Sequence, residues 1–311
     1  MNRHAKLASA LLVTTALAGP ALAQEAEECS SLSFSDVGWT DITATTAAAT
    51  LVLEALGYDT EINILSVPVT FQSLADGDTD IFLGNWMPGQ DSALGPYTEA
   101  GTIETVATNL EGTQYTLAVP QYTYDAGLQS FEDIAEFQEE LDGKIYGIEP
   151  GNEGNGYIIS LIESDTFGLG DFEVVESSEQ AMLAQVGRAV NAEEHVVFLG
   201  WEPHPMNSNY EMAYLTGGEE WFGDVGTVHT VTRAGLSEEC PNVGTFLTNL
   251  KFTLDMENEI MSAILDDGED ADDAAEAWLT EHPEVLESWL QGVTTVDGED
   301  GLAAVRAELG L

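Results

Sequence analysis

Short apolar runs alternate with longer amphipathic segments through most of this 311-residue chain. Strand-like runs at residues 31–37, 61–67 and 80–84 are separated by helix-like segments, a pattern typical of an open α/β sheet. A second alternating series begins at "YTLAVP" (115–120) and continues to "HVVFLG" (195–200). Two such series in one chain predict an α/β protein with two lobes.

The remaining segments complete this prediction. Further strands are expected at residues 144–150, 171–177 and 227–235. The expected helices share apolar positions three and four apart and lie at residues 42–57, 69–77, 131–143, 156–164 and 178–190, with more helices from 241 to the end.

The first residues have the features of a secretory signal peptide. Arg3 and Lys6 precede an apolar stretch that ends in the small-x-small tripeptide 21–23. This stretch is shorter than the roughly 20 residues that a membrane-spanning helix needs, and it contains Gly19 and Pro20. We expect cleavage of residues 1–23 near Ala23 and a periplasmic mature protein.

The chain has two cysteines, Cys29 and Cys240. Because an exported protein meets an oxidising compartment, we expect them to form one disulfide; two buried free thiols are the alternative. The bridge would return the last third of the chain to the first lobe. Lobe one then comprises 24–115 and, with the C-terminal helices, 226–311, whereas 116–225 form an inserted lobe two. Two crossovers make a hinge beside a ligand cleft.

The composition is strongly acidic. Asp and Glu number 56 against 7 Lys and Arg, which gives a formal net charge of −49 at pH 7, and Arg3 and Lys6 leave with the signal peptide. This charge excludes nucleic acid and anionic membrane surfaces as partners. The acids are dispersed along the chain, which indicates a solvated, halophilic surface whose potential attracts small cations.

Tryptophans follow three predicted strands where each strand ends: Trp39 in "DVGWTD", Trp86 in "FLGNWMPG" and Trp201 in "FLGWEPHP". Ligands of open α/β sheets bind outside the carboxyl ends of the strands, so these rings should meet across the cleft from loops of both lobes. Several aromatic faces together suit a quaternary ammonium group. Packing beneath a loop is the alternative for each ring alone. Packing is the role assigned to the other tryptophans: Trp221, Trp278 and Trp289.

Three further residues have two interpretations each. Asp41 is an N-cap or first-turn charge of the first helix, or a partner for a bound cation. Asn152 is an N-cap, or a neutral hydrogen-bond partner for a ligand tail. Tyr115 fills space at the crossover, or forms a fourth aromatic wall.

Signatures of enzymes and metal sites are missing from the sequence. The histidines are scattered, with no H-E-x-x-H pair and no cysteine cluster. The sequence has no G-x-S-x-G motif, and "GIEPGNEGNG" lacks the G-K-[ST] ending of a phosphate loop. We therefore expect a binding protein without metal or cofactor; an exported enzyme that acts on a quaternary amine or its ester is the alternative.

Motifs along the whole mature chain resemble those of periplasmic choline-binding proteins, the substrate-binding components of bacterial ABC importers for quaternary amines. The segments that carry the resemblance are "FSDVGWTDITATTAAATLVLEALGY", "LSVPVTFQSL", "DIFLGNWMP", "YTLAVP", "DGKIYGIEPGNEGN", "EVVESSEQAMLAQVGRA", "VFLGWEPHPMN", "ECPNV" and "DGEDGLAAVRAELGL". The resemblance implies a two-lobed type II binding-protein fold that closes on choline and delivers it to a membrane permease. We expect the protein to be a monomer.

The resemblance also implies the roles of individual residues. It implies an aromatic box of Trp39, Trp86, Tyr115 and Trp201, with Asp41 near the cation, Asn152 on the choline hydroxyl, and a disulfide between Cys29 and Cys240. A betaine carries a carboxylate that needs donors, so the carboxylate of Asp41 favours a ligand of net positive charge. Glycine betaine or a wider set of quaternary amines, including acetylcholine, remains the alternative.

Overall fold

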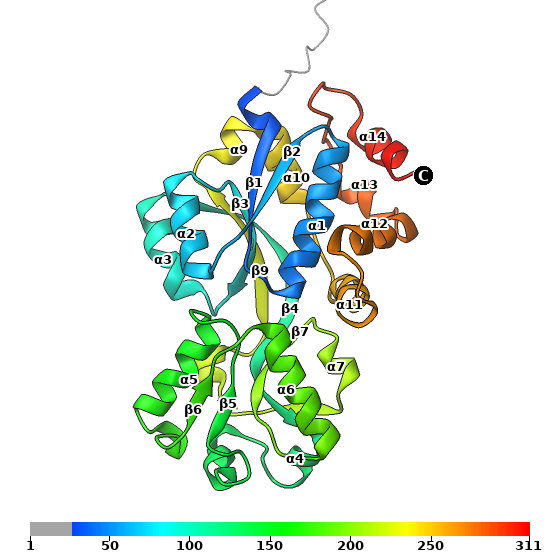
Figure 1. The fold of residues 1–311 in the computed structure, drawn as a ribbon. Helices are drawn as coiled ribbons and strands as arrows, with labels where there is room; N and C mark the ends of the chain where they lie inside the picture. The colour runs from blue at the N-terminus through cyan, green and yellow to red at the C-terminus, as the bar shows by residue number, and fades with distance from the viewer. Residues whose placement is uncertain (1–26) are drawn as a thin grey trace, which may run out of the picture.

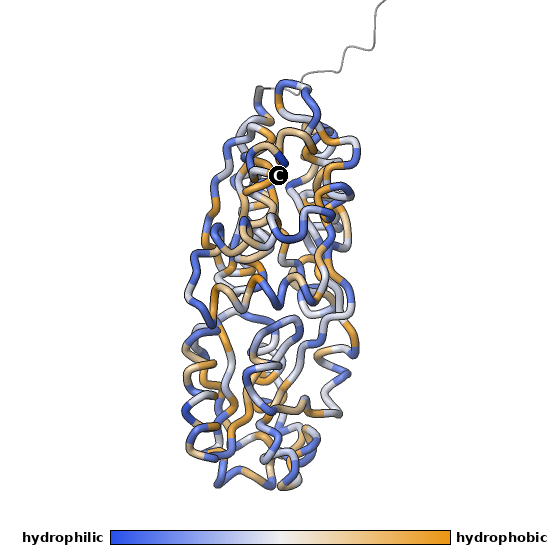
Figure 2. Tube along the Cα trace, turned by 90° about the vertical axis from the view of Figure 1, so that its right-hand side faces the viewer, coloured by the Kyte–Doolittle hydropathy of each residue, from blue (hydrophilic) through white to orange (hydrophobic). Residues whose placement is uncertain are grey.

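The computed structural model describes residues 27–311, so the predicted signal peptide lies outside the described residues. Two α/β lobes are stacked along the long axis of the molecule (Figure 1), and the view turned by 90° shows the same arrangement (Figure 2). Within residues 27–311, no helix is both long and apolar enough to cross a membrane.

The strands form one continuous sheet that runs through both lobes. In sheet order, the first eight are β2 (Asp59–Ile64), β1 (Ser31–Asp36), β3 (Ile81–Met87), β9 (Gly226–Arg233), β4 (Ile103–Pro120), β7 (Phe198–Glu202), β5 (Lys144–Tyr146) and β6 (Glu173–Val175). The short β8 (Met212–Tyr214) also pairs with β4. β1 is parallel to β2 and β3, whereas β9 is antiparallel to both β3 and β4.

The long strand β4 joins the two lobes. From Ile103 to Thr113 it pairs with β9 in the first lobe, and from Gln114 onward it pairs with β7 in the second. The chain returns to the first lobe at Gly226, the residue opposite Thr113. Two adjacent strands therefore cross between the lobes, which is the hinge arrangement of a type II binding protein.

Helices cover both faces of each half of the sheet (Figure 1). The α-helices are α1 (Thr40–Ala55), α2 (Val67–Asp76), α3 (Asp91–Ala100), α4 (Gln121–Asp125), α5 (Glu153–Glu163), α6 (Glu179–Ala192), α7 (Met206–Asn209), α8 (Glu219–Phe222), α9 (Leu236–Glu239), α10 (Pro241–Asn249), α11 (Leu254–Ser262), α12 (Ala271–Glu281), α13 (Val285–Trp289) and α14 (Gly301–Glu308). The other helical turns are η1 (Glu27–Ser30), η2 (Phe131–Phe137), η3 (Thr166–Gly168) and η4 (Ala263–Asp267).

Helix α1 is the centre of the first lobe's core. It packs against β1 and β3 on one side and against α11, α12 and α14 on the other. Because it is enclosed, its small residues are buried all round, including Ala44, Ala48 and Ala49 with no exposed surface. The close packing fixes α1 against the sheet and thereby fixes its N-terminus, which faces the second lobe.

The structure departs from the expected elements in several places, and helix α3 was not expected. Trp86 and Trp201 lie within β3 and β7 rather than on loops past the strand ends, because both strands continue beyond their glycines. The helix expected at 131–143 is only the short turn η2. β4 begins twelve residues before the expected strand at 115–120.

A disulfide joins Cys29 to Cys240, as predicted, across 211 residues of sequence. Both cysteines are buried, each exposing 2% of its surface. Closing so long a loop restricts the unfolded chain, so the double variant Cys29→Ser/Cys240→Ser should lose roughly 2–5 kcal/mol of unfolding free energy. Urea unfolding followed by tryptophan fluorescence measures the loss. An unchanged midpoint would contradict the assigned stabilising role.

Candidate ligand-binding site

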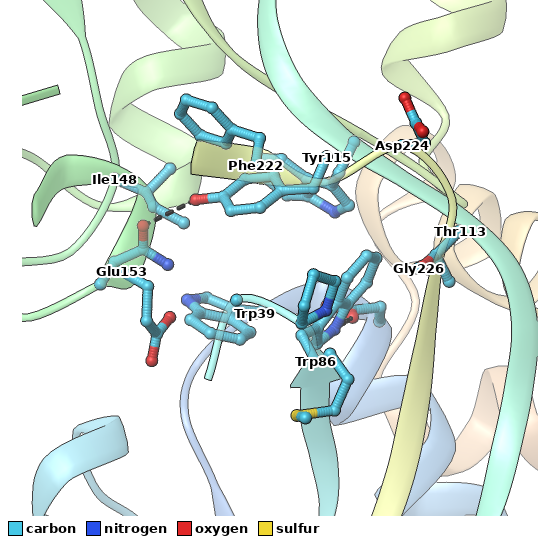
Figure 3. Close-up of a pocket in the computed structure, with 15 residues that line it drawn as sticks. Trp39, Trp86, Thr113, Tyr115, Ile148, Glu153, Phe222, Asp224 and Gly226 are labelled. Carbon is cyan, nitrogen blue, oxygen red and sulfur yellow. Dashed lines mark hydrogen bonds between the residues drawn. The ribbon is translucent and has the colours of Figure 1, made fainter. Parts of the chain in front are cut away.

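A small pocket between the lobes collects all six predicted ligand residues. Fifteen residues line it: Trp39, Asp41, Trp86, Met87, Pro88, Gly89, Thr113, Tyr115, Ile148, Asn152, Glu153, Trp201, Phe222, Asp224 and Gly226. Figure 3 shows Trp39 and Trp86 on one side of the cavity and Tyr115 on the opposite side. The pocket is therefore bounded by aromatic rings from both lobes.

The loop between β1 and α1 positions Trp39. Gly38 takes φ +81°, which a side chain would strain, and its N–H donates to Asp36 at 2.7 Å. The other oxygen of Asp36 accepts from the hydroxyl of Thr43 at 2.7 Å. Trp39 follows as the N-cap residue of α1 and exposes only 6% of its surface. Asp36 thus holds the turn that presents the indole to the pocket.

Two strand ends position the other indoles. Trp86 exposes 9% of its surface, and its ring centroid lies 6.3 Å from that of Tyr115. Trp201 exposes 4% and packs edge-on against His204, with ring centroids 4.8 Å apart. Since Trp201 lies opposite Tyr115 in the β4–β7 ladder, neighbouring strands place these two rings side by side.

The Asn152 side chain caps a helix and also lines the pocket. As the N-cap of α5, its Oδ1 accepts from the N–H groups of Gly154 and Asn155 at 2.8 and 3.3 Å. The Tyr115 hydroxyl donates to the same oxygen at 2.7 Å (Figure 3). Only glycine fits at 154, because a Cβ there would lie 2.1 Å from that hydroxyl. With Oδ1 occupied, the Nδ2 group is what Asn152 offers to a ligand.

Asp41 is a buried carboxyl group with one unpartnered oxygen. It is the second residue of α1 rather than its N-cap, which corrects one of the expected alternatives. Its Oδ2 accepts from the indole N–H of Trp86 at 2.9 Å, whereas Oδ1 has no hydrogen-bond partner among the described residues. Burial and, to a smaller extent, the nearby Glu179 raise the pKa of Asp41 to about 8, against the lowering effect of the hydrogen bond from Trp86.

The pocket wall is acidic and contains no basic side chain among its fifteen residues. Besides Asp41, the wall includes the carboxyl groups of Glu153 and Asp224. Burial raises the pKa of Glu153 to about 7. A bound cation would offset the cost of ionising these groups, whereas an anion would add to it.

Several lining residues were missed by the sequence analysis. Phe222, at the end of α8, meets Tyr115 edge-on with centroids 5.6 Å apart, and Glu153 follows Asn152 directly. Adjacency to Asn152 was a usable signal for Glu153. No local sequence pattern predicted that Phe222 or Asp224 lines the pocket, because their positions there depend on the tertiary fold of lobe two. The remaining tryptophans 221, 278 and 289 do not line the pocket.

Comparison with known proteins agrees with this geometry. Residues 30–281 match the family of OpuAC, the substrate-binding domain of an ABC-type glycine betaine transport system. This chain belongs to the OpuAC family. Its structural neighbours have the type II periplasmic binding-protein fold, and the family functions in transport.

Two solved structures of an ABC-transporter choline binding protein resemble this OpuAC-family protein over 92% of its chain and 100% of theirs. The complex with choline is 57% identical with a TM-score of 0.90. The unliganded semi-closed conformation is 58% identical with a TM-score of 0.85. Lactococcal OpuAC in its closed conformation with glycine betaine is 25% identical, covering 83% of this chain and 98% of its own, with a TM-score of 0.76.

Proposed function

We propose that this protein captures choline between its lobes and delivers it to the membrane permease of an ABC importer. The observation that carries the proposal is the Asp41 carboxyl group in an aromatic pocket. It is buried, its Oδ1 has no hydrogen-bond partner within residues 27–311, and the pocket wall has no basic side chain. A trimethylammonium group donates no ordinary hydrogen bonds, so it is held by ring faces and by a carboxylate. The similarity to a choline binding protein supports the same ligand.

The aromatic box would bind the trimethylammonium end of choline. Trp39, Trp86, Tyr115 and Trp201 would enclose the methyl groups, and their π faces would attract the positive charge. Asp41 would supply the counter-charge. Several such contacts, each of about 0.5–2 kcal/mol, together with burial of the methyl groups give micromolar binding or better.

Asn152 would bind the hydroxyl end of choline. The Nδ2 group of Asn152 would donate to the choline hydroxyl oxygen, since Oδ1 is already occupied. A betaine carboxylate would instead meet a wall that holds Asp41, Glu153 and Asp224 and no cation. The proposed site therefore prefers choline to glycine betaine on electrostatic grounds.

Titration of the refolded, ligand-stripped protein tests this preference. We expect choline to bind with a Kd in the micromolar range or below, and glycine betaine to bind at least about tenfold more weakly. Isothermal calorimetry and tryptophan fluorescence in high salt give both values. Equal or tighter binding of betaine would overturn the choice of choline and leave a quaternary-amine binding protein.

The remaining features of the proposal concern export and domain boundaries. We propose that residues 1–23 are removed, that the mature monomer is periplasmic, and that it acts by binding without catalysis. Lobe one would then comprise 24–115 and 226–311, and lobe two 116–225.

Recovery of unchanged choline and acetylcholine after long incubation with the protein tests the absence of catalysis. Any hydrolysed or oxidised product would contradict it.

A further inference from the structure

Five residues meet where the lobes touch: Trp39, which lines the pocket, and four residues that do not line it. Trp39 and Thr40 lie at the N-terminus of α1 in the first lobe, and Glu149, Glu179 and His204 lie in the second. We infer that these five residues form an interlobe latch that couples closure of the lobes to the ligand box. The inference rests on the proposed function, because it concerns how the same pocket closes on its ligand.

Glu179 is the centre of the latch. Its Oε2 accepts from the backbone N–H of Thr40 at 2.8 Å, and its Oε1 accepts from the hydroxyl of Thr40 at 2.6 Å. The Glu179 side chain has no exposed surface, and Thr40 exposes 3%. A buried carboxylate in lobe two thus lies on the N-terminus of a helix in lobe one, where the helix dipole favours negative charge.

His204 supplies a third donor to Glu179. The N–H of Met206 donates to Nδ1 of His204 at 2.9 Å, so that nitrogen carries no proton. The proton lies on Nε2, which is 3.1 Å from Oε1 of Glu179 and donates to it. His204 also packs edge-on against Trp201. The same carboxylate therefore contacts the residue that supports one wall of the box.

Glu149 links the latch to a second wall. Its Oε2 accepts from the indole N–H of Trp39 at 3.0 Å, and its Oε1 accepts from the backbone N–H of Glu179 at 3.0 Å. Trp39 is thereby held from the opposite lobe by a group that is itself tied to Glu179. Glu149 and Glu179 do not line the pocket, so they are positioning residues rather than ligand contacts.

The latch bonds can form only when the lobes are together. Trp39 and Thr40 donate from lobe one, whereas both acceptors belong to lobe two, 110 and 139 residues away in sequence. When the lobes separate, these donors would lose their carboxylate partners and form hydrogen bonds with water instead. The latch should therefore act mainly on the closed, liganded form and on the rate at which it opens.

The variant Glu179→Gln tests the latch with little change in shape. The amide NH₂ of the glutamine must face either the N–H of Thr40 or the two donors Thr40 Oγ1 and His204 Nε2. In either orientation of the amide, two hydrogen-bond donors therefore face each other. We expect its Kd for choline to rise by about tenfold or more through faster dissociation, with association nearly unchanged. Stopped-flow tryptophan fluorescence measures both rates.

Thr40→Val is the second variant, in case Glu179→Gln fails to fold. It removes only the hydroxyl donor, so we expect a smaller, severalfold increase in dissociation. The effect of the double variant should be less than the product of the single effects, because both remove the same contact. Asp273→Asn, which neutralises an exposed first-turn carboxylate of α12, is the matched control and should bind as wild type.

The outcomes separate the latch from the proposed ligand. If the wild-type protein binds glycine betaine more tightly than choline, the same variants are compared with betaine, since neither Glu179 nor Thr40 lines the pocket. Dissociation rates within twofold of wild type in the folded variants would overturn the latch alone. Wild-type protein that binds neither amine would overturn the proposed function, and the latch with it.

Discussion

Replacing Trp201 by leucine is expected to raise the Kd for choline by roughly thirtyfold, because one desolvated cation–π contact is worth about 2 kcal/mol. Leucine keeps an apolar side chain at a position that exposes 4% of its surface, so most of the packing in β7 is retained. What disappears is the aromatic face. The effect therefore reports on ring–cation attraction more than on burial.

An uncharged ligand separates these contributions. In 3,3-dimethylbutan-1-ol a carbon atom replaces the choline nitrogen, so it fills the same space without charge. We expect Trp201→Leu to bind this alcohol about as weakly as wild type does. Trp278→Leu makes the same chemical change outside the pocket, where the ring stacks on His282, and should leave choline binding unaltered. Wild-type choline affinity in Trp201→Leu would rule out the aromatic box.

Asp41→Asn is expected to weaken choline binding by roughly 100-fold or more, because it removes the counter-charge of the ligand. It should also stabilise the unliganded protein, because a buried Asp41 must either keep a proton or carry a charge that only the ligand balances. Asparagine can still accept the indole N–H of Trp86 through its carbonyl oxygen. The preference for choline over glycine betaine should shrink in this variant. Calorimetric titration with both ligands, with thermal unfolding of the unliganded proteins, measures these effects.

The pH dependence of wild type gives an independent check of Asp41. Its folded-state pKa is about 8, above the unfolded value near 3.8, so the native state keeps a proton that the unfolded state loses. Wild-type stability should therefore fall relative to Asp41→Asn as pH rises from about 4 to 8.

Choline binding should follow the opposite trend. If the cation binds the ionised carboxylate, affinity rises between about pH 6 and pH 8 and then levels off, and nearly one proton is released per choline bound at pH 7. Calorimetry in buffers of different ionisation enthalpy counts that proton. Choline affinity that is independent of pH in wild type, or Asp41→Asn with unchanged affinity, would contradict this role.

Much of the candidate site could be predicted from local sequence. Glycine and proline mark the strand ends that carry Trp86 and Trp201, and an Asp or Asn after a strand marks the start of a helix. The carboxyl ends of strands from both lobes meet at one edge, which is why these residues line one pocket. The disulfide was predictable because the sequence has only two cysteines and begins with the features of a signal peptide.

The errors of prediction also have physical reasons. The expected strands stopped at Gly84 and Gly200, yet both strands continue because neighbouring strands supply hydrogen-bond partners that no local pattern reveals. For the same reason, the polar residues at the start of β4 did not predict a strand, although β9 pairs with them. Helix α3 was missed because Gly95 and Pro96 interrupt its pattern.

By itself, the sequence determined the two α/β lobes, the disulfide and the six predicted residues that line the pocket. These depend on periodicity, on the presence of only two cysteines, and on motifs whose residues lie close together in the chain. Only the tertiary structure decided that Phe222 and Asp224 complete the pocket, and that Glu179 lies on the N-terminus of α1. Those contacts join residues from opposite lobes, or from distant parts of one lobe. They arise from the packing of lobes and elements, which leaves no local pattern in the sequence.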